Sequence, residues 1–394
     1  MKHSDIVILA AKRTPIGSFN GVLASVPATR LGASAIQAAL AHASIDPARI
    51  GEVIMGCVLQ AGLGQAPARQ AARAAGIPDA VGSTTVNKVC ASGMKAIMLG
   101  HDMLLAGSLD MVVAGGMESM SGAPYLLPGV RSGYRLGSRE LLDHMVYDGL
   151  RNAYDGRHMG EFAELCVERF GFTREQQDAY AISSVERAQA AVESGVFRNE
   201  ICPVTVKGRG GEQQVSEDEE PGRCDISRIP DLKPVFRPDG GSVTAANSAS
   251  ISDGAAALVL TTADEAYEHG LEPMARILAH ASHARDPSEF TIAPISAIRS
   301  LYQKTGWSSA DVDLYEINEA FAAVAMAAMQ ELQLDRSQVN INGGACALGH
   351  PIGATGARLV VSLVHALKRG GHKRGIAALC IGGGEATALA LELP

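Results

Sequence analysis

Aromatic and charged side chains are both scarce in this chain of 394 residues, at 4% and 19% of the sequence. The net charge is -8, which repels nucleic acid and anionic membrane surfaces. No apolar run is long enough to span a bilayer. We therefore expect neither a nucleic-acid partner nor a membrane partner, and an anionic ligand would have to be held by local hydrogen-bond donors.

The seven cysteines are far apart and none belongs to a CxxC pair. The sequence thus predicts neither a disulfide framework nor a zinc site, and a reducing compartment is expected. The first residues carry no signal or transit pattern, and the final Leu-Glu-Leu-Pro is not a peroxisomal address. We expect a cytoplasmic protein with no metal and no permanently bound cofactor.

Hydrophobic residues are plentiful at 47%, and 43 glycines allow close packing and many tight turns. The length suggests two or three domains. Strand and helix patterns alternate twice, first from residue 5 and again from residue 275. Both halves read βαβαβα followed by two strands. We predict a duplicated α/β fold, βαβαβαββ twice, with two sheets sandwiched by helices in five layers, α-β-α-β-α.

A more polar block interrupts the first half between its fourth and fifth strands. It should contain helices at 159–170 and 174–194, the second starting with Thr173 and Gln176 in capping-box register. The acidic stretch 208–223 is expected to be a solvated loop. The resulting domains are an N-terminal half of residues 1–120 plus 247–270, an inserted loop domain of residues 121–246, and a C-terminal half of residues 271–394.

In each half, the third expected strand leads into a Gly-rich loop and then a helix. In the first half the strand is 83–87, expected to be buried, and the loop carries Cys90. A thiol at a helix start meets free amides and the positive end of the helix dipole, which would lower its pKa. An ordinary buried cysteine would give the same local pattern.

The corresponding loop of the second half follows an expected strand at 339–342 and carries His350 in Gly349-His350-Pro351. A pseudo-twofold axis between the halves would bring His350 to Cys90. Taken alone, His350 also fits a hydrogen-bonded loop histidine without a chemical role.

At this point the chain resembles the thiolases along its whole length. Four motifs carry the resemblance: the Cys90 loop, Asn318-Glu319-Ala320-Phe321, Gly349-His350-Pro351, and Cys380-Ile381-Gly382-Gly383-Gly384. Each motif alone is weak, but all four together, in this order and spacing, are specific. The resemblance implies the thiolase fold, an acyl-CoA substrate and ping-pong acyl transfer through a cysteine thioester.

The resemblance also implies roles for the motif residues. Cys90 is the nucleophile, His350 takes its proton, and Cys380 is the acid and base at the α-carbon of acetyl-CoA. His350 and a water held by Asn318 would stabilise one oxyanion, and the amides of Cys90 and Gly382 the other. Cys380 also fits a core position, and Asn318 a helix N-cap.

Coenzyme A contacts follow from the same resemblance. Ala249 stands where relatives usually have a serine that contacts pantetheine; Ser248 or Ser250 would replace it, or that hydrogen bond is missing. Met159 would limit acyl length, although it also fits core packing at a helix start. The expected contacts are Leu150, His158, Met159, Arg223, Ser227, Phe236, Ala249, Ser250 and Phe321, with the loop length near Arg223 and Ser227 unsettled.

The His158-Met159-Gly160 run resembles the short-chain thiolases, so we expect an acetyl-CoA C-acetyltransferase that condenses two acetyl-CoA to acetoacetyl-CoA and CoA, reversibly. The alternatives are a 3-oxoacyl-CoA thiolase of β-oxidation for longer chains, a decarboxylating condensing enzyme, and a non-catalytic CoA- or lipid-binding relative. Cys380 argues against the decarboxylating class, which uses a second histidine. Residues 121–144 resemble the family's tetramer-forming loop, which predicts a homotetramer, a dimer of dimers.

Overall fold

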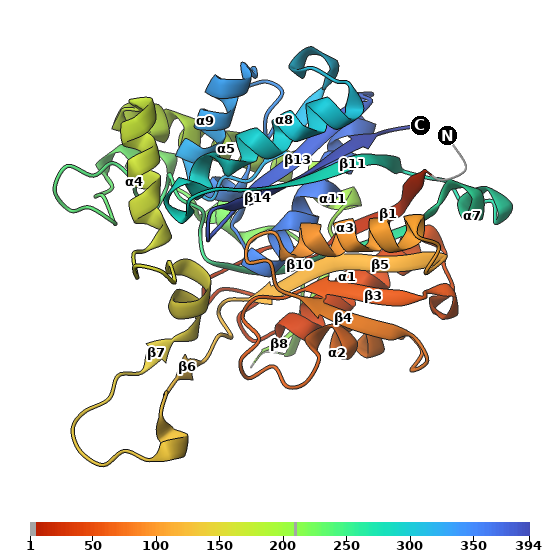
Figure 1. Cartoon of the computed structure of the whole chain (residues 1–394), viewed down its shortest axis with the longest axis horizontal. Coiled ribbons are helices and arrows are strands. Elements are labelled where there is room, and N and C mark those ends of the chain that lie inside the picture. Colours follow the sequence, from red (N-terminus) through yellow and green to blue (C-terminus); the bar gives the residue numbers. More distant parts are fainter. Residues whose placement is uncertain (1–4, 209–210) are drawn as a thin grey trace.

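The computed structural model describes residues 5–208 and 211–394. The strands of the two halves form two layers of one hydrogen-bonded sheet, and these layers lie one above the other in Figure 1. The N-terminal half contributes β1 (Ile6–Arg13), β2 (Gly17–Ser18), β3 (Glu52–Gly56), β4 (Gly82–Val86), β5 (Met111–Ser119) and β10 (Ser252–Thr262), with α1 (Ala28–Ala43), α2 (Pro67–Ala74), α3 (Ser92–Leu105) and α7 (Ala263–Glu268).

The C-terminal half repeats this plan after the chain has returned from the insert. Its two parallel strands lie at one end of the strand order, and its first and last strands pair with each other. It contributes β11 (Ala275–Ala284), β12 (Leu314–Ile317), β13 (Arg374–Ile381) and β14 (Glu385–Glu392), with α8 (Ala293–Thr305), α9 (Ala322–Leu332), α10 (Ala345–Leu348) and α11 (Ile352–Gly370).

Three apolar cores lie between the five layers, the middle one on both sides of the central helices, which confirms the α-β-α-β-α prediction. Helices α1 and α2 cover the outer face of one sheet, and α8 and α9 cover the outer face of the other. Helices α3 and α11 lie between the sheets (Figure 1). Every residue of α11 from 352 to 367 is buried, as a helix packed on all sides requires.

The strand order runs β12-β13-β14-β11-β1-β10-β5-β3-β4, so the sheets of the two halves are not separate. Strands β1 and β11 pair over three residues, from Ile6 to Ile8, and join them into one hydrogen-bonded ladder. Strand β4, expected to be buried, lies at the end of this ladder and alternates between exposed and half-buried residues. An edge strand with one open side explains its small and polar side chains.

The prediction of a strand at 339–342 is wrong, because Val339 makes a single isolated bridge to Tyr315. The next residue, Asn340, has a positive φ of 47°, which breaks the strand. Its side-chain amide accepts a hydrogen bond from the Ile317 N–H and donates one to the Ile317 carbonyl, both at 2.8 Å. A side chain therefore takes the place of backbone pairing beside β12.

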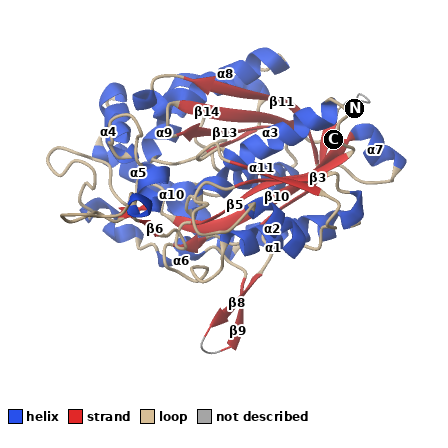
Figure 2. Cartoon of the chain, turned by 60° about the horizontal axis from the view of Figure 1, so that its bottom comes forward, coloured by secondary structure: helices blue, strands red, loops and turns tan. Residues whose placement is uncertain are grey.

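The insert contains the two predicted helices, α4 (Met159–Phe170) and α5 (Arg174–Glu193), with the Thr173–Gln176 capping box present. The prediction of a loop at 208–223 is wrong, because the chain forms part of a hairpin and a short helix there. The hairpin projects from the body in Figure 2. The remaining insert elements are β6 (Tyr125–Leu126), β7 (Leu142–Asp143), β8 (Val204–Gly208), β9 (Gly211–Val215) and α6 (Glu219–Arg223).

Short helical turns complete the chain, and within the described residues no helix has the length and apolar character needed to cross a bilayer. One of these turns, η3, is a π-helix that leads into the insert beside the Cys90 loop. The turns are η1 (Pro47–Arg49), η2 (Val130–Ser132), η3 (Met145–Leu150), η4 (Val196–Asn199), η5 (Ile226–Asp231), η6 (Pro287–Ile292) and η7 (Ser309–Asp311).

Candidate functional site

Cys90 lies on a strained turn between β4 and α3. Val89, the residue before it, has a φ of 48°, a conformation that β-branched side chains rarely adopt. The Ser92 hydroxyl holds this turn: it accepts a hydrogen bond from the Lys88 N–H at 2.8 Å and donates one to the Val89 carbonyl at 2.7 Å. The turn therefore presents the Cys90 side chain ahead of the helix.

The turn between β13 and β14 approaches Cys90 from the C-terminal half. An ion pair between Lys88 and Glu385 joins the two turns. The backbone N–H groups of Gly382 and of Cys90 itself both face the Cys90 sulfur. A Cβ atom at position 382 would lie 3.2 Å from the Met159 sulfur, so glycine permits this close approach.

The pKa of Cys90 is not lowered as the sequence suggested. Burial raises the pKa of this thiol to about 11, although the N–H groups of Gly382 and Cys90 act in the opposite direction. The charge of Glu118 raises the pKa further. These two N–H groups donate to the sulfur, but desolvation of the thiolate outweighs them. Cys90 therefore rests as a thiol and needs a base.

His350 is a neutral base held in one tautomer. Burial lowers its pKa to about 3, and the positive charge of Arg358 contributes. The Thr355 hydroxyl donates to the Pro351 carbonyl at 2.9 Å, so its oxygen accepts from His350 Nδ1 at 2.7 Å. That hydrogen bond places the imidazole proton on Nδ1. Nε2, which has no partner among the described residues, is left with a free lone pair.

Cys380 is the second-to-last residue of β13 and is fully buried. Burial raises its pKa well above the usual thiol value, and a negative charge on Cys90 raises it further. The two sulfurs are therefore close enough to interact electrostatically, although Cys380 does not line the cavity described below. A thiol with a raised pKa becomes a strong base once it is ionised.

Asn318 directly follows β12, and its backbone N–H donates to the Ala378 carbonyl at 3.0 Å. Its side chain is completely buried, and neither Oδ1 nor Nδ2 finds a partner among the described residues. It is not a helix N-cap, because α9 begins at Ala322 and its cap residue is Phe321. A buried amide without partners costs free energy unless a water or a ligand completes its hydrogen bonds.

A cavity of about 390 Å³ lies beside Cys90 and His350, and Asn318, like Cys380, is not among the residues that line it. Its walls come from both halves and from the insert, and most of the lining is apolar. Cys90, His350 and Gly382 line it, together with most of the expected coenzyme contacts: Leu150, His158, Met159, Phe236, Ala249, Ser250 and Phe321.

Arg223 and Ser227 do not line this cavity. Both are exposed, on α6 and η5 of the insert. The Arg223 guanidinium pairs with Glu219 at 3.0 Å, and the Ser227 hydroxyl donates to Asp225 at 2.7 Å. The structure thus places these two residues apart from the other expected contacts.

Aromatic rings form one wall of the cavity. His158 stacks on Phe236 with ring centroids 4.8 Å apart, and Phe236 meets Phe321 edge to face at 6.0 Å. Met159 forms part of another wall, shared with a neighbouring cavity of about 570 Å³ that Gly149 and Gly382 also line. Met159 therefore separates two hollow spaces, and its side chain decides how far the first one extends.

The segment around Ala249 runs beside the start of α9. The Ala249 N–H donates to the Ala320 carbonyl at 3.0 Å. The Ser248 hydroxyl is already engaged, donating to the Thr244 carbonyl at 2.7 Å. The Ser250 hydroxyl is buried and has no partner among the described residues. Of the two serines, Ser250 has a hydroxyl free for a ligand.

Two buried carboxylates support the site, and the first of them, Glu118, was given no role from the sequence. Glu118 at the end of β5 accepts hydrogen bonds from the N–H groups of Val58 at 3.0 Å, Leu59 at 3.1 Å and Gly353 at 2.9 Å. Burial raises its pKa to about 7 against these donors. The signal in the sequence was a lone carboxylate ending an apolar strand, in Gly115-Gly116-Met117-Glu118.

Glu319, in the Asn318-Glu319-Ala320-Phe321 motif, is the second buried carboxylate. It accepts hydrogen bonds from Tyr180 Oη at 2.9 Å and Ser184 Oγ at 2.8 Å, both on α5 of the insert. Asn340 Nδ2 and the Cys346 N–H donate to it from the loop before His350, at 2.7 and 3.1 Å. Glu319 thus ties the insert to the loops that carry Asn318 and His350.

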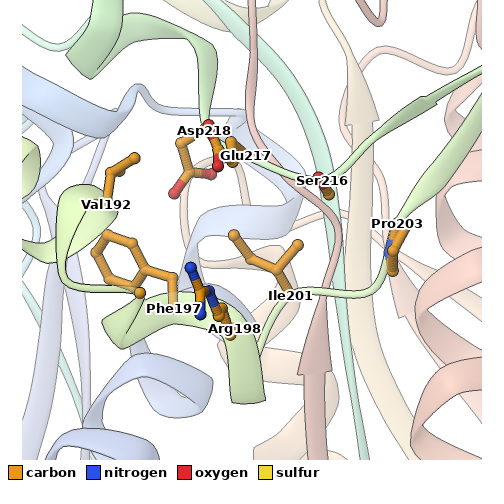
Figure 3. A pocket seen from close by; sticks show the side chains of 9 residues that line it. Val192, Phe197, Arg198, Ile201, Pro203, Ser216, Glu217 and Asp218 are labelled. Atoms are coloured by element: carbon orange, nitrogen blue, oxygen red, sulfur yellow. The ribbon is translucent and has the colours of Figure 1, made fainter.

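Another cavity, of about 340 Å³, lies between η4 and residues 216–218 (Figure 3). Neither a thiol nor an imidazole is among its lining residues. Asp218 at its edge is engaged by Arg13, with N–O distances of 2.7 and 2.8 Å. Of these two cavities, only the Cys90 cavity has both a thiol and imidazoles in its lining.

Comparison with known proteins places this site in a family. The family model described as "Thiolase, N-terminal domain" matches residues 6–264, and "Thiolase, C-terminal domain" matches residues 271–393. Acetyl-CoA acetyltransferase 2 of Arabidopsis thaliana is 51% identical over 99% of this chain and 97% of its own length. Acetyl-CoA acetyltransferase of Pseudomonas aeruginosa is 49% identical over 98% of this chain and 99% of its own.

Solved structures of thiolases also resemble this chain over its full length. The acetyl-CoA acetyltransferase of Bacillus anthracis superposes with a TM-score of 0.96 at 45% identity, covering 99% of both chains. The Acat5 thiolase of Ascaris suum, solved in complex with coenzyme A, gives a TM-score of 0.94 at 43% identity, covering 99% of this chain and 100% of that chain. With both family models matching and the duplicated fold shared in full, this chain is a member of the thiolase family.

Proposed function

We propose that this protein is an acetyl-CoA C-acetyltransferase that interconverts two acetyl-CoA with acetoacetyl-CoA and CoA. The observation that carries the proposal is the pairing, at one cavity, of a thiol with an imidazole whose Nε2 is unprotonated. Relatives of 47 to 51% identity that bear the name acetyl-CoA acetyltransferase support the choice of substrate.

The first half-reaction loads the acyl group. His350 Nε2 takes the proton of Cys90, and the thiolate attacks the carbonyl carbon of acetyl-CoA. The N–H groups of Cys90 and Gly382, which face the sulfur, are placed to hold an oxyanion that forms beside it. Collapse of this intermediate expels CoA and leaves acetyl-Cys90.

The second half-reaction forms the carbon–carbon bond. Cys380, as thiolate, removes a proton from the α-carbon of a second acetyl-CoA, and the resulting enolate carbon attacks the carbonyl of acetyl-Cys90. The bond between that carbonyl and the Cys90 sulfur then breaks, which releases acetoacetyl-CoA and leaves the Cys90 thiolate to be protonated again. The unpaired side chain of Asn318 supports a role in holding a water that, with His350, stabilises the enolate oxygen. In the degradative direction, Cys380 protonates the departing enolate.

Coenzyme A would reach Cys90 along the apolar cavity. Its pantetheine would contact Leu150, Phe236 and Phe321, and Ser250 would supply the hydrogen bond that Ala249 cannot make. The exposed positions of Arg223 and Ser227 suit contact with the nucleotide end, outside the cavity. We assign coenzyme binding to the inserted loop domain of residues 121–246 together with the 247–250 segment.

The test is covalent loading of Cys90. Purified protein mixed with acetyl-CoA should gain the mass of one acetyl group, located by peptide mapping on Cys90. A Cys380→Ser variant should still be loaded but lose condensation, since it lacks only the α-carbon base. Cys90→Ala should show neither loading nor thiolysis. Turnover by Cys90→Ala would overturn the mechanism, and absence of thiolysis in the wild type would favour a non-catalytic binding protein.

A 3-oxoacyl-CoA thiolase for longer chains is the second candidate, because a 570 Å³ cavity lies directly behind Met159. Thiolysis of C4 substrates should exceed that of C8 substrates by about tenfold or more if Met159 closes the acyl site, given the cost of forcing methylenes against a wall. Met159→Ala should join the two cavities and lower the ratio of the C4 rate to the C8 rate. Equal wild-type rates on both lengths would favour the longer-chain function.

We further propose a homotetramer in a reducing compartment, the cytoplasm. Seven free cysteines in the described residues support the reducing environment. The long β6–β7 ribbon extends away from the body in Figure 1, and its exposed apolar residues support a contact between chains. Acyl-CoA molecules and further copies of this chain are then its partners.

A further inference from the structure

A group of metal-ligand side chains lies far from the acyl-transfer site. His101 and Asp102 are on α3, whose first turn follows Cys90, but about 14 Å further along the helix axis than Ser92. His280 is on β11 of the C-terminal half. The three side chains therefore meet where the central helix of one half touches a strand of the other, away from the catalytic groups.

The three ligand atoms converge. Asp102 Oδ1 lies 3.0 Å from His101 Nδ1 and 2.8 Å from His280 Nε2. The oxygen and the two nitrogens all lie within 4.8 Å of one another. Ligands at about 2.1 Å from a tetrahedral zinc ion are about 3.4 Å apart, so small side-chain rotations would place these atoms around one ion.

The surroundings hold both imidazoles in place. The His101 side chain is largely buried, with 8% of the residue exposed, and the His280 ring packs edge to face against it with centroids 5.0 Å apart. Lys304 on α8 donates to the His280 carbonyl at 2.7 Å and fixes this part of β11. Asp102 is half exposed, so an ion can enter from solvent and keep water in its open coordination positions.

The ligand chemistry selects the kind of ion. Two imidazole nitrogens and one carboxylate oxygen suit zinc, cobalt, nickel or copper, whereas magnesium and calcium prefer oxygen ligands throughout. We propose that His101, Asp102 and His280 form a binding site for one divalent transition-metal ion, which links α3 of the N-terminal half to β11 of the C-terminal half.

The test uses cobalt(II), whose visible spectrum reports its ligands, on full-length protein freed of metal by a chelator. We expect saturable binding of one ion per chain, with d–d bands and without sulfur-to-metal charge transfer. His280→Ala should weaken binding by about tenfold or more, as should Asp102→Asn. His283→Ala, on the same strand but outside the cluster, is the matched control and should bind normally.

Zinc should likewise raise the unfolding temperature of wild type and His283→Ala, and not of His280→Ala, because an ion that binds only the folded state stabilises it. Thiolysis by His280→Ala would show that this variant is folded. Three results would overturn the proposal: no cobalt binding to wild type, equal binding by all variants, or a spectrum dominated by thiolate ligands.

Discussion

At the scale of single residues, Cys90 and His350 line the same cavity as a neutral thiol and a neutral imidazole. Burial raises the pKa of one to about 11 and lowers the pKa of the other to about 3, because neither charged form is solvated well in the cavity. We therefore expect the Cys90 proton to transfer to His350 only as the sulfur attacks a substrate thioester, whose carbonyl oxygen takes up the negative charge. This arrangement limits side reactions of the thiolate.

The neutral pair predicts how the reactivity of Cys90 depends on pH. The rate of its alkylation by iodoacetamide should rise about tenfold per pH unit between about pH 7 and pH 9, since the thiolate fraction does so below the pKa. Peptide-resolved mass spectrometry would measure it, with Cys224 as an internal comparison. A rate that is flat across neutral pH would show a preformed thiolate–imidazolium pair and contradict the prediction.

Ser250 allows a second prediction at this scale. Ser250→Ala should raise the KM for CoA about five- to tenfold with little change in kcat, the effect of one lost hydrogen bond to the substrate. Ser248→Ala is the matched control, because its hydroxyl bonds to Thr244 and not to the cavity. If Ser248→Ala raises KM and Ser250→Ala does not, the assignment is reversed.

At the scale of elements, Glu118 joins three segments of backbone by hydrogen bonds. It sits at the end of β5, receives the amides that follow β3, and receives the Gly353 N–H from the first turn of α11. A carboxylate is favoured at a helix N-terminus. Because His350 directly precedes this helix, the N-terminal half positions the base that the C-terminal half contributes.

The raised pKa of Glu118 predicts a dependence of stability on pH. Its pKa is 4.5 in an unfolded chain and about 7 in the folded one, so the folded state binds the proton more tightly. The contribution of Glu118 to the free energy of unfolding is fully present below pH 4.5 and is lost as the pH rises through 7. Relative to Glu118→Gln, the wild type should lose about 3 kcal/mol of unfolding free energy across that interval.

Urea denaturation of both proteins at several pH values would measure the difference. Asp253→Asn serves as a comparison, since burial also raises the pKa of Asp253 but its carboxylate accepts from the Ser121 N–H and not from the Gly353 N–H of α11. A constant difference between wild type and Glu118→Gln at every pH would contradict the assigned shift.

At the scale of the whole molecule, the β6–β7 ribbon carries apolar side chains into solvent. Leu136 is 89% exposed and Leu141 62% exposed. Exposed leucines gathered on one projecting segment mark a contact surface. In a dimer of dimers, such ribbons would pack together and bury these side chains.

Charges placed on the ribbon should therefore break the tetramer. Leu136→Asp with Leu141→Asp should reduce the light-scattering mass from four chains to two, while Tyr267→Asp, equally exposed on α7 at 88%, should leave four. The acyl loading of Cys90 should persist, because the ribbon lies outside the cavity. A wild-type mass of one chain, or a four-chain mass in the leucine variant, would contradict the proposal.

The sequence by itself determined the strand–helix order apart from the strand expected at 339–342, the layers, the loops that carry Cys90 and His350, and the strand ends at Asn318 and Cys380, because periodicity and Gly-rich turns are local properties. Only the tertiary structure decided the rest. Desolvation reversed the expected pKa of Cys90, a side chain replaced the strand at Asn340, and β1 joined β11 across the halves. The burial of the site residues depends on segments that are far apart in the chain. The same is true of the amides that donate to Glu118 and of the His101–Asp102–His280 cluster, so no local sequence pattern predicts them.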